Sequence, residues 1–160
     1  MSLLEEVVNS EEFRTKVISY QNSSGEREYQ KNYIWNDSSQ RLTNEDVYNL
    51  LMEANEKMVP GTLNEMNIFA RLRKCSWSKR KFSVWCRKVI GSTSPRTTPW
   101  MVLNWKFYRN YKAHNMVANI VHEWIHLLGF LHGKRNMREE VPYVVGSIAG
   151  QVAKGILDNR

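Results

Sequence analysis

Cysteine and long apolar runs are scarce in this chain of 160 residues. Its two cysteines, Cys75 and Cys86, do not form a CxxC pair. Two cysteines are too few for a disulfide scaffold, so we expect two reduced, partly buried thiols; the alternative, one bridge within a β-hairpin, would require a secreted context. No run of about 18 uncharged apolar residues occurs, which argues against a transmembrane helix. The first residues are acidic and lack the apolar segment of a signal peptide, so we predict a cytoplasmic protein, with secretion left open.

The composition excludes a fibre or a disordered chain. Hydrophobic residues make up 42% and charged residues 24% of the sequence, which is ordinary for a globular protein. A chain of this length suits one domain and can bury roughly 70% of its unfolded surface without disulfides. We therefore expect a single domain over residues 1–160, a monomer, and no association with a membrane.

Acidic residues are absent from residues 66–122, although the whole chain carries a net charge of only +7. This stretch should give one face of the protein a positive potential. Three interpretations are open: a solvated sheet face, a site for an acidic partner or substrate, and a nucleic-acid surface. The basic residues of the stretch are Arg71, Arg73, Lys74, Lys79, Arg80, Lys81, Arg87, Lys88, Arg96, Lys106, Arg109 and Lys112.

The hydrophobic pattern predicts helices, then strands, then two more helices, which is an α+β order. Gly146 and Gly150 lie four residues apart and should let the last helix approach a neighbour closely. The expected helices cover residues 3–20, 44–59, 113–128 and 143–157; Thr43 or Asn44 caps the second of them, and Pro60-Gly61 ends it. The expected strands cover residues 67–75, 81–90 and 100–108, with a hairpin turn at 77–80 between the first two. A further short strand is expected at 33–35, inside a loop.

Three of the four histidines lie in one short segment, residues 122–132, which reads HExxHxxGxxH. His122 and His126 are four residues apart, so on a helix their rings project from the same face. Gly129 lets the chain leave the helix with a positive φ, and the turn brings His132 back. Three imidazole nitrogens can bind Zn²⁺ and leave one position open, which is typical of a catalytic zinc site.

Glu123 follows the first histidine and is rotated about 100° from it around the helix. From there it can reach a zinc-bound water whose pKa the ion lowers toward about 7. Glu123 would take the proton of this water and pass it to the leaving amine. We therefore expect one Zn²⁺ per chain and the hydrolysis of peptide bonds in a polypeptide substrate.

These eleven residues resemble the motif of the metzincin zinc endopeptidases. The resemblance implies that His122, His126 and His132 are zinc ligands and that Glu123 is the general base and acid. It also implies a zincin-like α+β fold: a twisted, mainly antiparallel or mixed sheet packed on helices, with an active-site helix followed by a C-terminal helix. The N-terminal helix and loop would cover residues 1–40, the upper part 41–129 and the lower part 130–160.

In metzincins an edge strand above the cleft pairs with extended substrate. The predicted strand at residues 100–108 resembles this element, so Trp100, Val102 and Asn104 are candidate substrate-binding residues. We expect strand addition as the mode of recognition.

The sequence departs from the metzincin pattern at the Met-turn, which is atypical or missing. Met137 lies five residues after His132, which is too close. Alternatively Pro142 makes the turn, Val141 takes the packing role of the methionine, and Tyr143 follows two residues later. Some metzincins have a tyrosine at that offset, as an extra zinc ligand or an oxyanion donor; the alternative for Tyr143 is simple packing at the start of the last helix.

Two other hypotheses remain beside the endopeptidase. The acid-free stretch is compatible with a nucleic-acid-associated protein whose protease site is secondary or vestigial, although no nucleic-acid-binding signature is present. The zinc ion could instead serve only to hold the fold together. The substrate hypothesis that follows from the charge is an acidic polypeptide.

Overall fold

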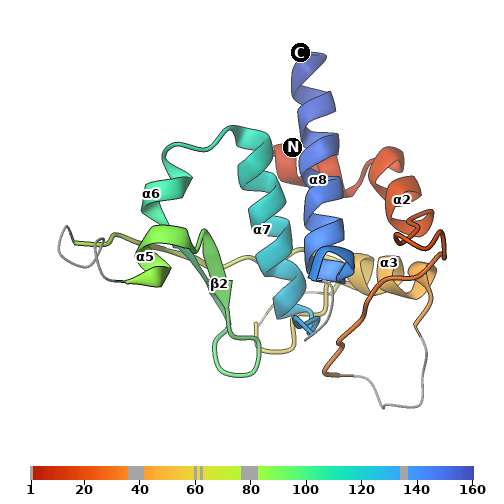
Figure 1. Cartoon of the computed structure of the whole chain (residues 1–160), viewed down its shortest axis with the longest axis horizontal. Helices are drawn as coiled ribbons and strands as arrows, with labels where there is room; N and C mark the ends of the chain where they lie inside the picture. The colour runs from red at the N-terminus through yellow and green to blue at the C-terminus, as the bar shows by residue number, and fades with distance from the viewer. Residues whose placement is uncertain (1, 36–41, 60, 62, 77–82, 134–136) are drawn as a thin grey trace.

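The computed structural model describes residues 2–35, 42–59, 61, 63–76, 83–133 and 137–160. In these residues the chain has an α+β architecture, in which a three-stranded mixed sheet lies beside a set of helices (Figure 1). The coarse fold class predicted from the sequence is therefore correct. The predicted hairpin turn at residues 77–80 lies outside the described residues.

Two short helices, α1 (Leu3–Val8) and α2 (Glu11–Ile18), replace the single helix predicted over residues 3–20. The break occurs because Ser10 caps α2, and its hydroxyl accepts a hydrogen bond from the Phe13 N–H at 3.1 Å. Phe13 and Val17 are buried, as the apolar pattern predicts.

The third helix, α3 (Asn44–Glu53), begins at its predicted cap, Thr43. The Thr43 hydroxyl accepts from the Asp46 N–H, and the Asp46 carboxylate accepts from the Thr43 N–H, which makes a capping box. The helix ends before the predicted Pro60-Gly61 stop, because Ala54 adopts a left-handed conformation with φ of 45°.

The sheet has the order β1 (Ala70–Arg73), β3 (Met101–Asn104), β2 (Gly91–Thr93). The central strand β3 runs parallel to β1 and antiparallel to β2. Met101 and Leu103 are buried on the face of the sheet that packs on the core. A short bridge also pairs Tyr33 with Phe130, at the place of the predicted short strand.

Of two further predicted strands, the one at residues 81–90 is wrong in its described residues and the one at 100–108 is only partly correct. The segment predicted as a strand at residues 81–90 contains the helix α5 (Val84–Lys88), which Ser83 caps. The strand predicted at 100–108 ends at Asn104, whose Oδ1 accepts from the Lys106 N–H at 3.2 Å and so starts the helix α6 (Trp105–Tyr108).

The predicted edge strand is the centre of the sheet, which corrects the assignment of Trp100, Val102 and Asn104 to substrate pairing. Partners on both sides use the backbone of β3. Asn104 is only 1% exposed, and its amide donates to the carbonyl of Val89 at 2.9 Å. Sequence periodicity identifies a strand but carries no information on strand order, which is why the edge was misplaced.

Cys75 and Cys86 form a disulfide, whereas two reduced thiols were predicted. The bridge joins the segment after β1 to α5, with 6.0 Å between the two Cα atoms. Both cysteines are buried. The alternative of a bridge within a hairpin is also wrong in detail, since one cysteine lies on a helix.

Two long helices complete the fold: α7 (Ala113–Leu127) and α8 (Val141–Asp158), which follows the 3-10 turn η1 (Met137–Glu139). They lie side by side in Figure 1. As predicted, the glycines of α8 allow close approach: a Cβ on Gly146 would lie 2.8 Å from the Ala118 carbonyl oxygen, and one on Gly150 would lie 2.8 Å from the Ala118 Cβ. Among the described residues, no helix has the length and apolar character needed to cross a membrane.

Candidate metal centre

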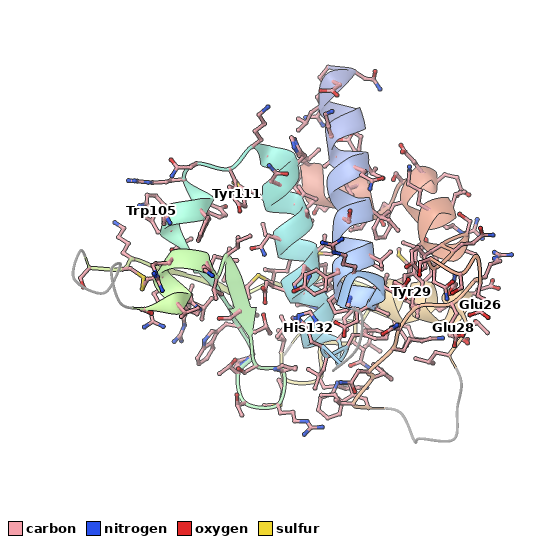
Figure 2. All side chains as sticks on the ribbon, in the orientation of Figure 1. Glu26, Glu28, Tyr29, Trp105, Tyr111 and His132 are labelled. Carbon is pink, nitrogen blue, oxygen red and sulfur yellow. A yellow bond between two sulfur atoms is a disulfide. The ribbon has the colours of Figure 1, made fainter. Side chains whose placement is uncertain are left out.

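The three histidines of the motif meet at the C-terminal end of α7. The rings of His122 and His126 project from one face of the helix, with centroids 5.0 Å apart. The ring of His132 returns to within 5.2 Å of the first and 4.6 Å of the second. One nitrogen from each ring lies within 4.8 Å of the other two, so the group could hold a metal ion. Figure 2 shows His132 beside the ends of α7 and α8.

Gly129 makes this return possible, as the sequence predicts. It has a φ of 107°, a conformation that residues with a side chain rarely adopt. A Cβ at this position would also overlap the indole ring of Trp35. The chain therefore reverses tightly enough to bring His132 back over the helix face.

A distant N-terminal segment holds the returning loop in place. The Ile34 N–H donates to the Gly129 carbonyl at 3.0 Å, and the Leu131 N–H donates to the Asn32 carbonyl at 2.7 Å. The Asn32 side chain adds a bond to the His132 carbonyl at 3.0 Å. The loop that carries the third histidine is thus paired along its length with residues about 100 positions earlier in the sequence.

Hydrogen bonds fix two of the rings through their Nδ1 atoms. His126 Nδ1 lies 2.6 Å from the Phe130 carbonyl oxygen, and His132 Nδ1 lies 2.7 Å from Glu140 Oε2. Both partners are acceptors, so each Nδ1 carries the proton and donates. The Nε2 atoms of His126 and His132, which face each other at 3.2 Å, are then the ring nitrogens left to bind an ion. Metal-binding histidines commonly have their second ring nitrogen hydrogen-bonded in this way, so the donor set fits a metal ion.

Burial keeps His122 and His126 neutral at pH 7. It lowers the pKa of His122 to about 3 and that of His126 to about 4, and in His122 the neighbouring His126 and His132 lower it further. A hydrogen bond to the Pro142 carbonyl opposes the shift in His122. Neutral imidazoles have the free lone pair that metal binding needs, so no proton has to be removed from them at pH 7.

Glu140 is a buried carboxylate that the sequence reasoning missed. It is 2% exposed, and it occupies the N-cap position of α8, although its carboxylate makes no capping hydrogen bond to the helix. Its Oε2 accepts from His132, and its Oε1 accepts from the Gly133 N–H at 2.6 Å. The sequence offers little to reveal it, because it stands in a polar segment, and its backbone pairs with Gln30 from the N-terminal segment.

Glu123 lies beside the histidines and is 4% exposed. Burial raises the pKa of its carboxyl to about 7, and the hydroxyl of Thr93, which donates to Oε2 at 2.8 Å, opposes the rise. The strand β2 can come this close because it has a glycine there: a Cβ on Gly91 would lie 2.8 Å from Glu123 Oε1. Sequence reasoning identified Glu123 but neither of its two neighbours on β2.

A groove of about 780 Å³ runs past these residues. Strand β2 and the end of α5 line one side, α7 the floor, and the start of α8 the other side. Lys88 and Asn119 lie in its wall together with the three histidines and Glu123. The edge strand that borders this groove is β2, in place of the strand predicted from the sequence.

Tyr143 lies against the three-histidine group. It is 41% exposed, and its ring centroid is 4.7 Å from that of His122 and 4.8 Å from that of His132. Val141, two residues before it, is fully buried. The structure thus brings Tyr143 to the group of residues that the motif predicts.

The fold and the site together define an α+β protein with a three-histidine group that could hold a metal ion and an adjacent buried carboxylate. Comparison of the chain with family models, with curated proteins and with solved structures finds no match.

Proposed function

We propose that the protein is a zinc-dependent endopeptidase of metzincin type. The observation that carries the proposal is the convergence of three imidazole rings beside the buried carboxylate of Glu123, in an open groove. A purely structural site would have four protein ligands and no such carboxylate.

Zinc is the ion that we assign to His122, His126 and His132. Imidazole nitrogens are ligands that zinc prefers, and sets of three histidines are used by catalytic zinc sites. When bound, the ion supplies Lewis-acid polarisation of a substrate carbonyl and activation of water. The Nδ1 hydrogen bonds of His126 and His132, which leave their Nε2 atoms facing each other, support this assignment.

Glu123 is the general base and acid in this proposal. Its Oε2 is held by the Thr93 hydroxyl, so Oε1 is the oxygen that receives a proton from the attacking water and delivers it to the leaving amine. A carboxyl with a pKa near 7 exchanges protons in both directions at neutral pH.

Tyr143 is proposed to stabilise the reacting carbonyl. Its ring stands against two of the proposed ligands, while 41% of the residue is exposed. A phenol hydroxyl in this place donates a hydrogen bond to the oxygen on which negative charge develops.

We propose that extended substrate pairs with β2. This strand borders the groove, and among the described residues only β3 pairs with it. Its outer edge therefore offers backbone donors and acceptors to an extended polypeptide. The Cys75–Cys86 bridge favours an oxidising compartment over the predicted cytoplasm, since structural disulfides are rare in reducing compartments.

The test is metal analysis and cleavage with the full chain. We expect about one zinc per chain, cleavage of an unstructured protein, and loss of cleavage with the metal retained in Glu123→Gln. Glu45→Gln is the control, because Glu45 is an exposed acid on α3. Absence of zinc after reconstitution, or cleavage that persists in Glu123→Gln, refutes the proposal. Unfolding by a chelator without any cleavage by the loaded protein would assign the zinc a structural role instead.

A further inference from the structure

A second surface of the protein lies on the sheet face turned away from the core. Residues that pair in register share a face, so Arg71 lies with Val102 and Arg73 with Asn104. The opposite face carries the buried Met101 and Leu103. Asn104 is buried on this side, whereas Arg71 and Arg73 are exposed; we call the exposed part of this side, with the aromatic residues that flank it, the outer face.

Basic and aromatic side chains alternate on the outer face. The guanidinium of Arg71 lies 3.5 Å from the centroid of the Trp100 ring, and that of Arg73 lies 4.6 Å from Trp85. The Lys74 ammonium lies 5.2 Å from the ring of Trp105. Figure 2 shows Trp105 on α6, on the side of the molecule far from α2. These contacts hold three cationic side chains in place at distances typical of cation–π pairs.

No carboxylate neutralises these cations within the part of the chain that the structure describes. Arg71, Arg73 and Lys74 are exposed and form no ion pair with described residues. The sequence around them contains no acidic residue over positions 66–122. The outer face is therefore positively charged and complementary to an anionic partner.

The strand that carries the two arginines is an edge strand. All four residues of β1 are exposed, and among the described residues it pairs only with β3. Its free backbone groups can accept one more strand. An extended polypeptide can form these bonds, whereas a nucleic acid has no matching backbone.

The tryptophans give a second reason to favour a polypeptide. Single-stranded nucleic acid binds by stacking its bases on free aromatic faces. Arg71 and Arg73 already stand over the rings of Trp100 and Trp85. We propose that the outer face and the free edge of β1 bind an extended acidic segment of a partner protein, by strand pairing and by ion pairs to Arg71 and Arg73. The order of the strands places this surface at the edge of the sheet opposite the metal groove, and binding there requires neither metal nor catalysis.

Fluorescence anisotropy of a labelled peptide tests this proposal. The probe is a peptide of alternating Glu and Thr, titrated with the full chain at about 50 mM salt, where charge attraction is weakly screened. The variant Glu123→Gln serves as the background, so that the peptide is not cleaved. Adding Arg71→Glu and Arg73→Glu should weaken binding at least about tenfold.

Three controls separate this site from general attraction. Lys57→Glu with Lys154→Glu makes the same change in net charge at two exposed positions elsewhere, and it should leave binding within about twofold. A peptide N-methylated at alternate residues keeps its charge but loses N–H donors, and it should bind about tenfold more weakly. Circular dichroism of each variant confirms that it is folded.

Equal loss in both charge variants, or equal binding of the N-methylated peptide, overturns the proposal. Tighter binding of a single-stranded oligonucleotide of equal charge overturns it in favour of nucleic acid. Because the readout is binding by a variant without Glu123, failure here leaves the peptidase proposal intact, and failure of cleavage leaves this site intact.

Discussion

Substitution of Glu140 by glutamine should weaken zinc binding without unfolding the protein. The carboxylate is 2% exposed and accepts two hydrogen bonds, from His132 Nδ1 at 2.7 Å and from the Gly133 N–H at 2.6 Å. Glutamine has nearly the same volume but only one acceptor oxygen, so at least one of the two donors then faces an NH₂ group. A hydrogen bond to a charged group contributes about 1.5–3 kcal/mol.

Part of this lost free energy should appear as weaker zinc binding. Without a strong acceptor at Nδ1, the His132 ring is a weaker base and turns more freely, and such changes behind a ligand lower metal affinity by about 10–100-fold. We therefore expect Glu140→Gln to raise the zinc dissociation constant by about this factor. The assay is competition with a chromophoric chelator at pH 7, together with thermal unfolding of the metal-free protein.

Glu139→Gln is the matched control. Glu139 is the neighbouring residue, but its carboxylate accepts from Ser23 and Gln30 and is not bonded to a histidine. It should leave zinc affinity within about twofold of the native value. Glu140→Asp keeps the charge and should recover part of the affinity. Unchanged affinity in Glu140→Gln, or an equal loss in Glu139→Gln, would refute the reasoning.

Four further predictions follow from the same geometry. Gly129→Ala should lower the free energy of unfolding by more than about 1 kcal/mol, because Gly129 has a positive φ. An unfolding midpoint in denaturant equal to that of the unsubstituted protein would contradict this. The metal-free protein should lose stability as pH falls from about 6.5 toward 4, because His122 and His126 have folded pKa values of about 3 and about 4 and the unfolded chain takes up their protons first, while the raised pKa of Glu123 offsets part of this loss; urea titrations at several pH values measure it. Reduction of the Cys75–Cys86 bridge should destabilise the fold by about 3 kcal/mol, given the short loop that it closes, and an unchanged melting curve in a thiol reductant would oppose this. Tyr143→Phe should lower kcat by about 10²-fold with little change in zinc affinity; loss of zinc instead would identify the tyrosine as a ligand.

The helix that carries the motif was predictable because several signals in the sequence agree there. Apolar residues recur at helical spacing, and Gly129 ends the pattern at the residue where the structure reverses. The prediction that His122, His126 and His132 come together needed only local geometry: a helix of known pitch and one tight turn.

The sheet was less predictable because strand order depends on distant contacts. Alternation of apolar residues at 81–90 suggested a strand, but Ser83 caps a helix and Cys86 is held by a disulfide. The position of β3 at the centre of the sheet is set by pairing with residues about 30 positions away in β1, which no local pattern encodes.

The supporting residues of the site were missed for the same reason. Thr93 reaches Glu123 from 30 positions away, and the role of Glu140 depends on a chain reversal together with pairing to Gln30. The candidate metal ligands are close together in the sequence and form a motif, whereas the groups that orient them are brought to the site by tertiary packing.

The pairing of residues 32–34 with the loop that carries His132 links two distant parts of the chain energetically. Bonds from Asn32 and Ile34 restrain the loop, and an ion held by His132 would restrain it from the other side. By thermodynamic reciprocity, each restraint strengthens the other by the same factor. Zinc loading should then slow amide exchange at Ile34 and Leu131, and deletion of the N-terminal segment should loosen the ion although no ligand is removed.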